Sequence, residues 1–523
     1  MDQAEQMSGM TRRRFVKASA GAAVAAGVGS GLLPGSVLPG VLAQQKQDIN
    51  MLHRGSIETS LHILNMWGKK PQAVNDYYTA IYNALAASPT ATYEDVSKDA
   101  EVRRLVAELG VTHLGGPLLG CLEPDGATVW VRTLEPASVT VKAEIGGKET
   151  AFGPAASTYE SDLSALVKVT GLPTGKRTPY RVFVDGKPIT MQENAAITTP
   201  NASLATTTRI AFGTCPHRWG LGNEQLMGTI LARNPLVMIL SGDIGAQGRR
   251  NNFAMHRADY ALRDMHPAWQ KLVAATPVYT SWDDHDYFSN DQWGIPRGMT
   301  DADRRGVREV YTRSWNNTSY GVEETGEGIF QHTTVGPVDI ILTDSRYFRE
   351  KTGKHCYLGK RQMAWLKDTL KSCKGRFIIM TNSTMWSDFV SNGKDSWGRY
   401  DPEGREELFS FIEAEKIGGV LLTSGDRHGA RVFSIPRPSG FSFYEFEPAC
   451  LGGRVGPPAR SDAWETQLYG TSGKYAFGEF TFNTELDDPE VTFNLIGEAG
   501  NLMYELKLNR STLTPGSTPG SGA

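Results

Sequence analysis

The feature that most constrains the fold is a repeated pattern in which an apolar run is followed at once by a polar cluster. It begins near Thr208 and continues to about Asn509, and stretches of helical periodicity, such as residues 252–272, separate the runs. Continuous apolar strands that alternate with helices are typical of layered α/β domains. We therefore predict one such domain over residues 208–510. Its apolar runs are residues 209–212, 236–240, 278–280, 338–342, 377–380 and 419–422.

The polar clusters that follow these runs contain aspartate, histidine, asparagine, cysteine and arginine, which are residue types that bind metals or take part in catalysis. In open α/β sheets, ligands bind beyond the carboxyl ends of the strands, so clusters at successive strand ends are predicted to converge on one site. The six clusters are residues 213–217, 241–243, 282–286, 343–346, 381–383 and 424–428.

The composition of these clusters indicates a metal site. Carboxylates, imidazoles, an amide oxygen and a thiolate suit Fe, Mn, Zn or Ca. The adjacent carboxylates of Asp283 and Asp284 would repel each other unless a cation or an arginine lay close to them. Each residue also has a structural alternative: Asp243 after a glycine is typical of a turn or a helix cap, and Cys215 alone is typical of a buried small residue. The joint occurrence of Asp-Asp-His-Asp and Gly-Asp-Arg-His after apolar runs favours the metal site.

Five further histidines are interpreted as core or surface residues, because none adjoins a carboxylate within a strand-end cluster. They are His217, His256, His266, His332 and His355.

The ordered motifs resemble the alkaline phosphatase D (PhoD-like) branch of the metallophosphoesterases. They are Gly242-Asp243, Trp282-Asp283-Asp284-His285-Asp286 with Asn290-Asp291, Asp344-Ser345-Arg346, Gly359 with Gln362 and Trp365-Leu366, and Gly425-Asp426-Arg427-His428. The resemblance extends from about Gly115 to about Asn509. It implies a two-layer β-sheet core flanked by helices, preceded by a small all-β sandwich of the immunoglobulin or fibronectin kind. It also implies a site with two or more metal ions that hydrolyses phosphate esters.

The resemblance assigns roles to individual residues. Metal ligands would be Cys215, Asp243, Asp284, Asn382, Asp426 and His428. His285 would occupy the general-acid position, and Arg346 would hold the phosphate with its planar guanidinium. Iron and calcium are the metals that the family implies.

One position departs from the family pattern. The family commonly places a tyrosine, a ferric ligand, three residues after the aspartate of Gly242-Asp243, and Ala246 occupies that position here. The sequence therefore leaves open whether the metals are iron and calcium, or whether zinc or manganese takes part.

The N-terminus resembles a twin-arginine export signal. Thr11, Arg12, Arg13, Phe15 and Lys17 match its pattern, and an Ala/Gly-rich run ends in Val41-Leu42-Ala43. We expect residues 1–43 to be removed, with a basic apolar helix that stays attached as the alternative. The resemblance implies the twin-arginine machinery as a partner and a periplasmic or secreted protein.

Further segments differ in their hydrophobic periodicity and composition. Residues 44–114 show helical periodicity, and residues 115–200 show short alternating strands that predict the sandwich, in a packing role only. The tail, residues 511–523, is rich in Ser, Thr, Pro and Gly and is predicted to be disordered. The aromatic residues of two long segments, residues 387–401 and 448–475, predict either a rim around the site or a satellite core.

Charge and cysteine content exclude several classes of protein. A net charge of -3 does not favour nucleic acid as a partner, and no second apolar run is long enough to span a membrane. Five cysteines without a CxxC motif support neither a zinc ribbon nor a disulfide scaffold, and a Cys356–Cys373 bridge is undecided.

The remaining functional alternatives are a phosphodiesterase of the phospholipase or nuclease type and an inactive binding member of the fold. The substrate itself, whether a monoester or a diester, small or derived from a lipid, is not decided by the sequence.

Overall fold

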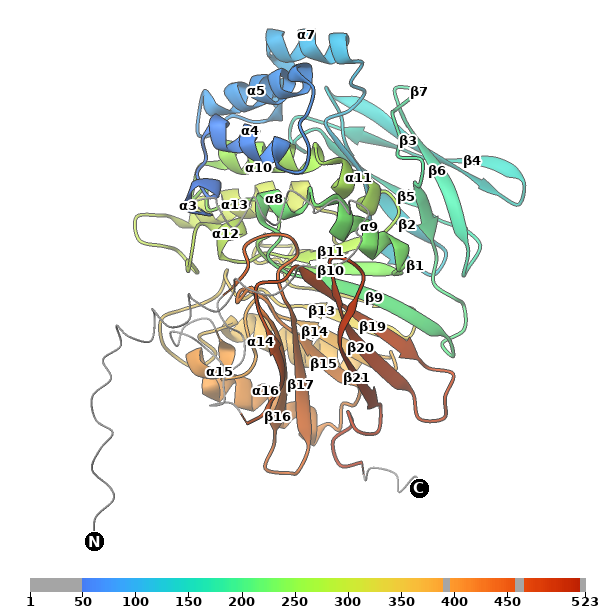
Figure 1. Ribbon diagram of the computed structural model, residues 1–523, viewed down its shortest axis with the longest axis vertical. Helices are drawn as coiled ribbons and strands as arrows, with labels where there is room; N and C mark the ends of the chain where they lie inside the picture. Colours follow the sequence, from blue (N-terminus) through green and yellow to red (C-terminus); the bar gives the residue numbers. More distant parts are fainter. Residues whose placement is uncertain (1–48, 389–395, 457–464, 518–523) are drawn as a thin grey trace, which may run out of the picture. The chain divides into compact units, whose positions relative to one another are not determined.

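The computed structural model describes residues 49–388, 396–456 and 465–517 (Figure 1). The predicted export signal, residues 1–43, lies outside the described residues, as do residues 518–523 of the predicted tail. None of the helices in the described ranges combines the length and the hydropathy that crossing a bilayer requires.

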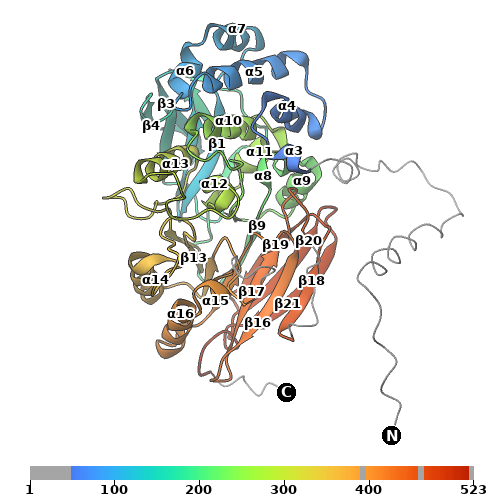
Figure 2. The same ribbon diagram turned by 90° about the vertical axis from the view of Figure 1, so that its left-hand side faces the viewer.

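The first described segment is helical. Its helices are α3 (Ile49–Leu52), α4 (Ile57–Met66), α5 (Gln72–Ala86), α6 (Tyr93–Lys98) and α7 (Ala100–Leu109). The side chains of Ser56 and Thr92 accept backbone hydrogen bonds at the starts of α4 and α6, as N-caps do. The apolar faces of α4 and α5 share a buried cluster with α10 (Phe253–Asp264), and Tyr78 Oη donates a hydrogen bond to the Ala258 carbonyl. In Figures 1 and 2, α10 lies between these helices and the core sheets.

Two small antiparallel sheets follow. One has the order β1–β2–β5, with β1 (Gly115–Glu123), β2 (Gly126–Arg132) and β5 (Ser164–Val169). The other has the order β4–β3–β6–β7, and β8 also pairs with β6. Its strands are β3 (Ala137–Ile145), β4 (Lys148–Ser157), β6 (Arg177–Val184), β7 (Lys187–Pro188) and β8 (Ala196–Thr198). Val129 and Val167 of the first sheet share a buried cluster with Val141 and Val182 of the second.

The main domain contains two larger sheets. The six-stranded sheet has the order β11–β10–β9–β19–β20–β21, and the seven-stranded sheet has the order β12–β13–β14–β15–β17–β16–β18. The first comprises β9 (Thr207–Gly213), β10 (Val237–Ser241), β11 (Val278–Ser281), β19 (Ala476–Asn483), β20 (Glu490–Gly497) and β21 (Leu502–Asn509). The second comprises β12 (Gln331–Val335), β13 (Val338–Leu342), β14 (Phe377–Thr381), β15 (Val420–Thr423), β16 (Ala430–Pro436), β17 (Ser442–Pro448) and β18 (Gln467–Thr471).

The register places the ends of the parallel strands at one level. Leu240 of β10 pairs with Gly213 of β9 and with Thr280 of β11. In the other sheet, Thr381 of β14 is level with Leu342 of β13 and Thr423 of β15. The loops that follow these six strands therefore start side by side.

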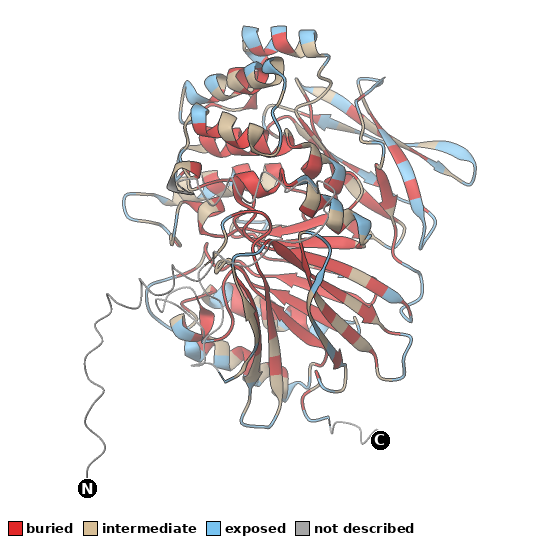
Figure 3. Cartoon of the chain, viewed as in Figure 1, coloured by how far each residue is buried: buried red, intermediate tan, exposed pale blue. Residues whose placement is uncertain are grey.

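Alternation of side chains along the central strands of the seven-stranded sheet directs them to two faces, and both faces are buried in β13, β14 and β15. Ile379 and Leu421 belong to the cluster shared with the other sheet. Ile378 and Leu422 pack with α14 (Gly359–Ser372) and α16 (Pro402–Ala414) on the outer face. Figure 3 shows buried residues along the central strands of both sheets, whereas β18 and β21 are only partly buried. The predicted fold class, a two-layer core flanked by helices and preceded by a small β domain, is confirmed.

The other helices lie in the loops of the main domain. They are α8 (His217–Gly220), α9 (Glu224–Ala232), α11 (Pro267–Val273), α12 (Asp284–Tyr287), α13 (Asp301–Ser314) and α15 (Trp397–Tyr400).

The structure differs from one expectation. The tail is packed as far as residue 517: Leu513 is fully buried, and its carbonyl accepts a hydrogen bond from the amide of Gly419. The prediction of disorder missed the one large apolar residue in that segment.

The described part of the aromatic segment before α16 favours one of the two alternatives that the sequence left open. Trp386 and Trp397 are fully buried beside Tyr357, as in a satellite core.

The cysteines form no disulfides in the structure. All five are free, including Cys356 and Cys373, which the sequence left undecided.

Candidate active site

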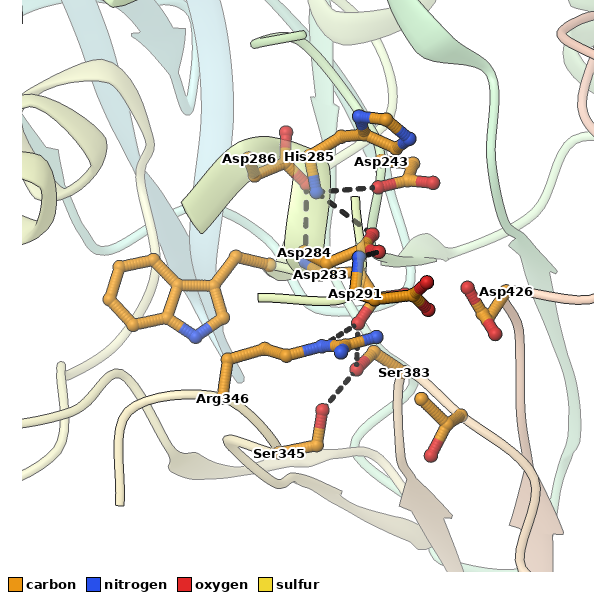
Figure 4. Close-up of polar contacts among 12 residues, drawn as sticks. Asp243, Asp283, Asp284, His285, Asp286, Asp291, Ser345, Arg346, Ser383 and Asp426 are labelled. Atoms are coloured by element: carbon orange, nitrogen blue, oxygen red, sulfur yellow. Dashed lines mark hydrogen bonds and ion pairs between the residues drawn. The ribbon is translucent and has the colours of Figure 1, made fainter. Parts of the chain in front are cut away.

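The loops after β9, β10, β11, β13, β14 and β15 converge at the level strand ends. Figure 4 shows residues from the loops after β10, β11, β13, β14 and β15. Three groups of side chains there have ligand atoms within 4.8 Å of one another: Cys215, Asp243 and His428; Asp243, Asp284 and His285; and Asp283, Asp284 and Asp426. Asp243 belongs to two of the groups and Asp284 to two, so they link all three into one cluster.

The loop that carries Asp243 is held tightly by its neighbours. The Asp243 carbonyl accepts a hydrogen bond from the amide of His217 at 2.7 Å, and the Gly242 carbonyl accepts one from the amide of Cys215 at 3.1 Å. A Cβ atom on Gly242 would lie 2.4 Å from Cβ of Asp283. Only glycine therefore allows the β10 loop to approach the β11 loop this closely.

The backbone is strained at the cluster. Five residues other than glycine adopt the left-handed conformation there, with φ between 51° and 70°. Such conformations cost about 1 to 3 kcal/mol each and gather at functional sites, where the surrounding structure enforces them. The five are Cys215, His217, Asp243, Asp426 and His428.

The aspartates after β11 have different partners. Asp283 accepts hydrogen bonds from Arg346 Nε and from Ser383 Oγ, the latter at 2.8 Å. Asp284 accepts from the amides of His285 and Asp291. Asp286 accepts from the amides of residues 244 and 245, both at 3.1 Å, so it fixes the loop that carries Asp243.

The electrostatics of the cluster favour a cation. Burial, and then the charges of Asp284 and Asp283, raise the pKa of Asp243 well above its ordinary value. Burial raises the pKa of Asp283 to about 7 although Arg346 opposes the shift. The pKa of Asp284 is lowered to about 2, because Arg346 and His285 outweigh its burial. Three buried carboxylates this close, with one arginine among them, carry an excess of negative charge that metal ions would neutralise. The residues present therefore fit metal ions.

The Cys215 side of the cluster fits the same interpretation. Burial, and then Asp243, raise the pKa of the Cys215 thiol well above its ordinary value, and burial and then Arg454 lower the pKa of His428 to about 3. An imidazole held neutral is ready to bind a metal, and a cation would stabilise the thiolate that these surroundings otherwise disfavour.

Arg346 faces the carboxylates from the loop after β13. Its amide donates to Asp344 Oδ1 at 3.0 Å, and the same oxygen accepts from Trp282 Nε1 at 2.7 Å, which fixes the start of the loop. Its side chain is fully buried and pairs with Asp283 through Nε. Both terminal nitrogens, Nη1 and Nη2, are buried without a hydrogen-bond partner among the described residues. The guanidinium thus has donors to spare for an anionic ligand.

His285 lies on the other side of the cluster. Its amide donates to Asp243 Oδ1 at 3.3 Å, and Nδ1 of its ring is buried without a partner in the described part of the chain. Burial lowers the pKa of His285, although Asp284 opposes the shift.

Asn382 differs from the other predicted ligands. Its Oδ1 accepts a hydrogen bond from Thr343 Oγ1 at 3.0 Å, and its Nδ2 donates to Tyr357 Oη and to the Thr384 carbonyl, both at 2.9 Å. Both ends of the amide are therefore engaged with the strand ends, and its role as a ligand stays a prediction.

Sequence reasoning missed His217. Its ring is fully buried, its Nε2 lies 4.0 Å from Asp243 Oδ2, and its centroid is 5.3 Å from that of His428. The carboxylate that accompanies it comes from the next strand of the sheet, so the sequence cluster that contains His217 did not include it. The position of His217, two residues after Cys215 at a strand end, was the available signal.

Sequence reasoning also missed His53. His53 lies in the turn between α3 and α4, and the centroid of its ring is 5.1 Å from that of His285. No feature of the sequence near His53 indicates this position.

Comparisons with known proteins agree with this architecture. Residues 240–496 match a family model described as PhoD-like phosphatase, and residues 112–202 match a domain of unknown function (DUF7800). Alkaline phosphatase D of Bacillus subtilis (strain 168) is 23% identical over 216 residues, 36% of this chain and 36% of that protein. The alignment thus spans about a third of the length of that relative.

Two solved structures share the fold. A structure of PhoD covers 78% of this chain and 93% of its own, with a TM-score of 0.63 and 17% identity. Purple acid phosphatase PPD1 from yellow lupin (Lupinus luteus) seeds covers 75% of this chain and 74% of its own, with a TM-score of 0.53 and 11% identity. On the family match, supported by the strand-end motifs and by the curated relative, residues 240–496 form a PhoD-like phosphatase domain.

Proposed function

We propose that the protein is a metal-dependent hydrolase of phosphate esters. The observation that carries the proposal is a buried cluster of carboxylates faced by Arg346, whose two terminal nitrogens have no partner among the described residues. Carboxylates attract cations, and a planar pair of free N–H groups suits two oxygens of a phosphoryl group. A site with both features binds a phosphate ester and its metals together.

The metals would be held by side chains at the strand ends. Cys215, Asp243 and His428 would hold one ion, and Asp284 and Asp426, which lie in a second group with Asp283, would hold another. His217 joins the first group, because its buried Nε2 has no partner in the described ranges and faces Asp243. Asn382 remains a candidate ligand from the family resemblance alone. Bound metal ions supply a water molecule that is deprotonated near neutral pH and neutralise charge on the phosphoryl group.

The other polar residues act on the substrate. Arg346 binds the phosphoryl oxygens and opposes the negative charge that they carry. His285 lies beside the same cluster, where it holds a proton for the leaving alkoxide oxygen. Ala246 is fully buried and provides no ligand, so His217 supplies on this side a donor that the family commonly obtains from tyrosine. Iron, calcium, zinc and manganese all accept this set of oxygen, nitrogen and sulfur donors.

The test is hydrolysis of a chromogenic phosphate monoester and of the matching diester, with elemental analysis of the same sample. We expect activity on one or both esters that is lost with a chelator and restored by metal. Asp243→Asn and Asp426→Asn should abolish turnover, whereas Asp301→Asn on the surface of α13 should not. Unchanged activity in either of the first two variants would refute the assignment of the site.

The same panel separates the alternatives. Preference for the diester, including a lysophospholipid or a nucleic-acid analogue, would identify a phosphodiesterase of the phospholipase or nuclease type. A folded protein that binds no metal and hydrolyses neither ester would be a binding member of the family.

We also propose that the protein is exported. The proposal rests on Thr11, Arg12, Arg13, Phe15 and Lys17 of the sequence, which match a twin-arginine signal. Replacement of both Arg12 and Arg13 by lysine should keep the precursor inside the cell, as fractionation and immunoblotting would detect. Unchanged export of that variant would contradict the proposal.

A further inference from the structure

His53 belongs to the N-terminal helical segment, yet its side chain reaches the candidate metal site. Besides its approach to His285, its ring centroid lies 5.6 Å from that of His217 and 5.5 Å from that of Trp219. His53 lies outside residues 240–496, which match the PhoD-like family model. The family match therefore does not include His53.

Two buried arginines hold the turn that carries His53. Arg218 Nη2 donates to the carbonyls of the two residues that flank His53, at 2.7 and 2.8 Å. Arg249 Nη1 donates to the carbonyl of His53 itself at 3.1 Å. Both arginines also pair with the buried carboxylate of Asp259, at 3.0 and 2.7 Å. The turn is thus fixed to the main domain through its backbone, which leaves the imidazole of His53 for another role.

The side chain of Gln247 connects His53 to His217. Gln247 Nε2 donates to Nδ1 of His53 at 2.7 Å, and Gln247 Oε1 accepts from Nδ1 of His217 at 3.1 Å. Because a side-chain amide offers donors at one end and an acceptor at the other, it imposes opposite protonation on the two Nδ1 atoms. With its proton on Nδ1, His217 has a lone pair on Nε2, the atom that faces Asp243 Oδ2 at 4.0 Å.

Either orientation of the amide leaves one buried N–H without an acceptor among the described residues, at Nε2 of His53 or at Nε2 of His217. Only the orientation in the structure leaves Nε2 of His217 free to bind a cation beside Asp243. Trp219 stacks on the ring of His217 with centroids 4.8 Å apart and an interplanar angle of 13°, which fixes the plane of the imidazole. The stacking sets the plane, and the amide sets which nitrogen carries the proton.

We propose that His53 is a positioning residue that acts through Gln247 to hold His217 in the tautomer that binds a metal ion. The inference rests on the proposed function, because the metal that His217 would bind is part of it. Without His53, Nε2 of Gln247 loses the acceptor that it has in the structure, and the amide is free to turn. His217 then divides its population between two tautomers, of which only one has a free Nε2. Loss of such supporting hydrogen bonds lowers metal affinity by about 10- to 100-fold.

The experiment is a titration of chelator-stripped protein with Co²⁺, followed by its visible absorption. His53→Ala should weaken Co²⁺ binding by about 10- to 100-fold. His53→Asn should restore much of it, because the amide oxygen of asparagine can replace Nδ1 as the acceptor. The matched control is His62→Ala, which removes a histidine from α4 of the same segment and should leave the affinity within about twofold. Circular dichroism and the melting temperature check that each variant is folded.

A double-mutant cycle shows whether His53 acts through Gln247. Gln247→Leu should weaken Co²⁺ binding as much as His53→Ala does, and the combined variant should be no weaker than Gln247→Leu alone. Additive losses would overturn the proposal, because His53 would then act independently of the bridge.

The remaining outcomes separate this inference from the proposed function. If His217→Ala weakens Co²⁺ binding but His53→Ala matches the His62→Ala control, the role of His53 is refuted and the metal site stands. If His217→Ala binds Co²⁺ like the parent, the inference is refuted, and ester hydrolysis by the parent decides the proposed function separately. A parent protein that binds no Co²⁺ and hydrolyses no ester refutes both.

Discussion

Substitution of Arg346 by lysine tests the proposed phosphate site most directly. Lysine keeps the positive charge beside Asp283 but lacks the two planar N–H groups that are unpartnered in the described part of the chain. Hydrogen bonds from a charged donor contribute about 1.5 to 3 kcal/mol each. Loss of one to two of them from the transition state gives about 1.5 to 6 kcal/mol, which lowers kcat/KM by about 10- to 25,000-fold.

The assay is the steady-state hydrolysis of whichever chromogenic ester the parent accepts, at saturating metal. Arg263→Lys is the matched control: Arg263 is also fully buried and pairs with a neighbouring carboxylate, at 2.8 Å, but at Asp264, outside the cluster. We expect that variant to lose stability and to change kcat/KM by less than about threefold once folded. A folded Arg346→Lys enzyme with kcat/KM within threefold of the parent would show that the guanidinium does not bind the phosphoryl group.

Three further outcomes are expected. Gly425→Ala should lower the melting temperature and cost about 1 to 3 kcal/mol, because its Cβ would lie 2.2 Å from Thr214 Oγ1; an unchanged melting temperature would contradict the packing. Gly228→Ala in α9 should instead stabilise the protein by about 0.5 to 1 kcal/mol in urea unfolding, because nothing lies within 4 Å of its Cβ and alanine favours helix; a loss of stability would count against this reasoning. The metal-free protein should lose stability as pH rises from about 4 to about 7, because folded Asp283, with a pKa of about 7, keeps a proton that the unfolded chain has released. Urea midpoints at pH 5 and pH 8 measure this effect, Asp283→Asn should reduce it, and an equal pH dependence in that variant would refute the assignment.

The sequence predicted most of the fold because its strongest signals are local. An apolar run such as residues 338–342 is buried on both faces, and the polar residues after it mark where the strand ends. The register of the strands then brings the ends together, so the convergence of Asp243, Asp284 and Asp426 followed from topology alone. The packing of the tail was not predicted, because its Ser-, Thr-, Pro- and Gly-rich composition is typical of disorder, and a single buried side chain, Leu513, anchors it.

The part of the site that the sequence did not predict depends on contacts between distant segments. His217 gains its carboxylate neighbour from another strand, and His53 reaches the cluster through a turn held by Arg218 and Arg249. Neither contact produces a periodicity or a spacing. The free donors of Arg346 could likewise be recognised only once the partners of its Nε were known.

The left-handed residues of the cluster have a consequence for how such proteins lose their activity. Glycine would adopt the backbone at Cys215, Asp426 and His428 without strain, so replacement there should make the metal-free chain more stable while it removes a proposed ligand. A descendant no longer selected for hydrolysis would therefore accumulate glycine or asparagine at these positions early, before its sheets change. Relatives that keep bulky or charged side chains there despite the strain are, by the same reasoning, those still under selection to bind metal.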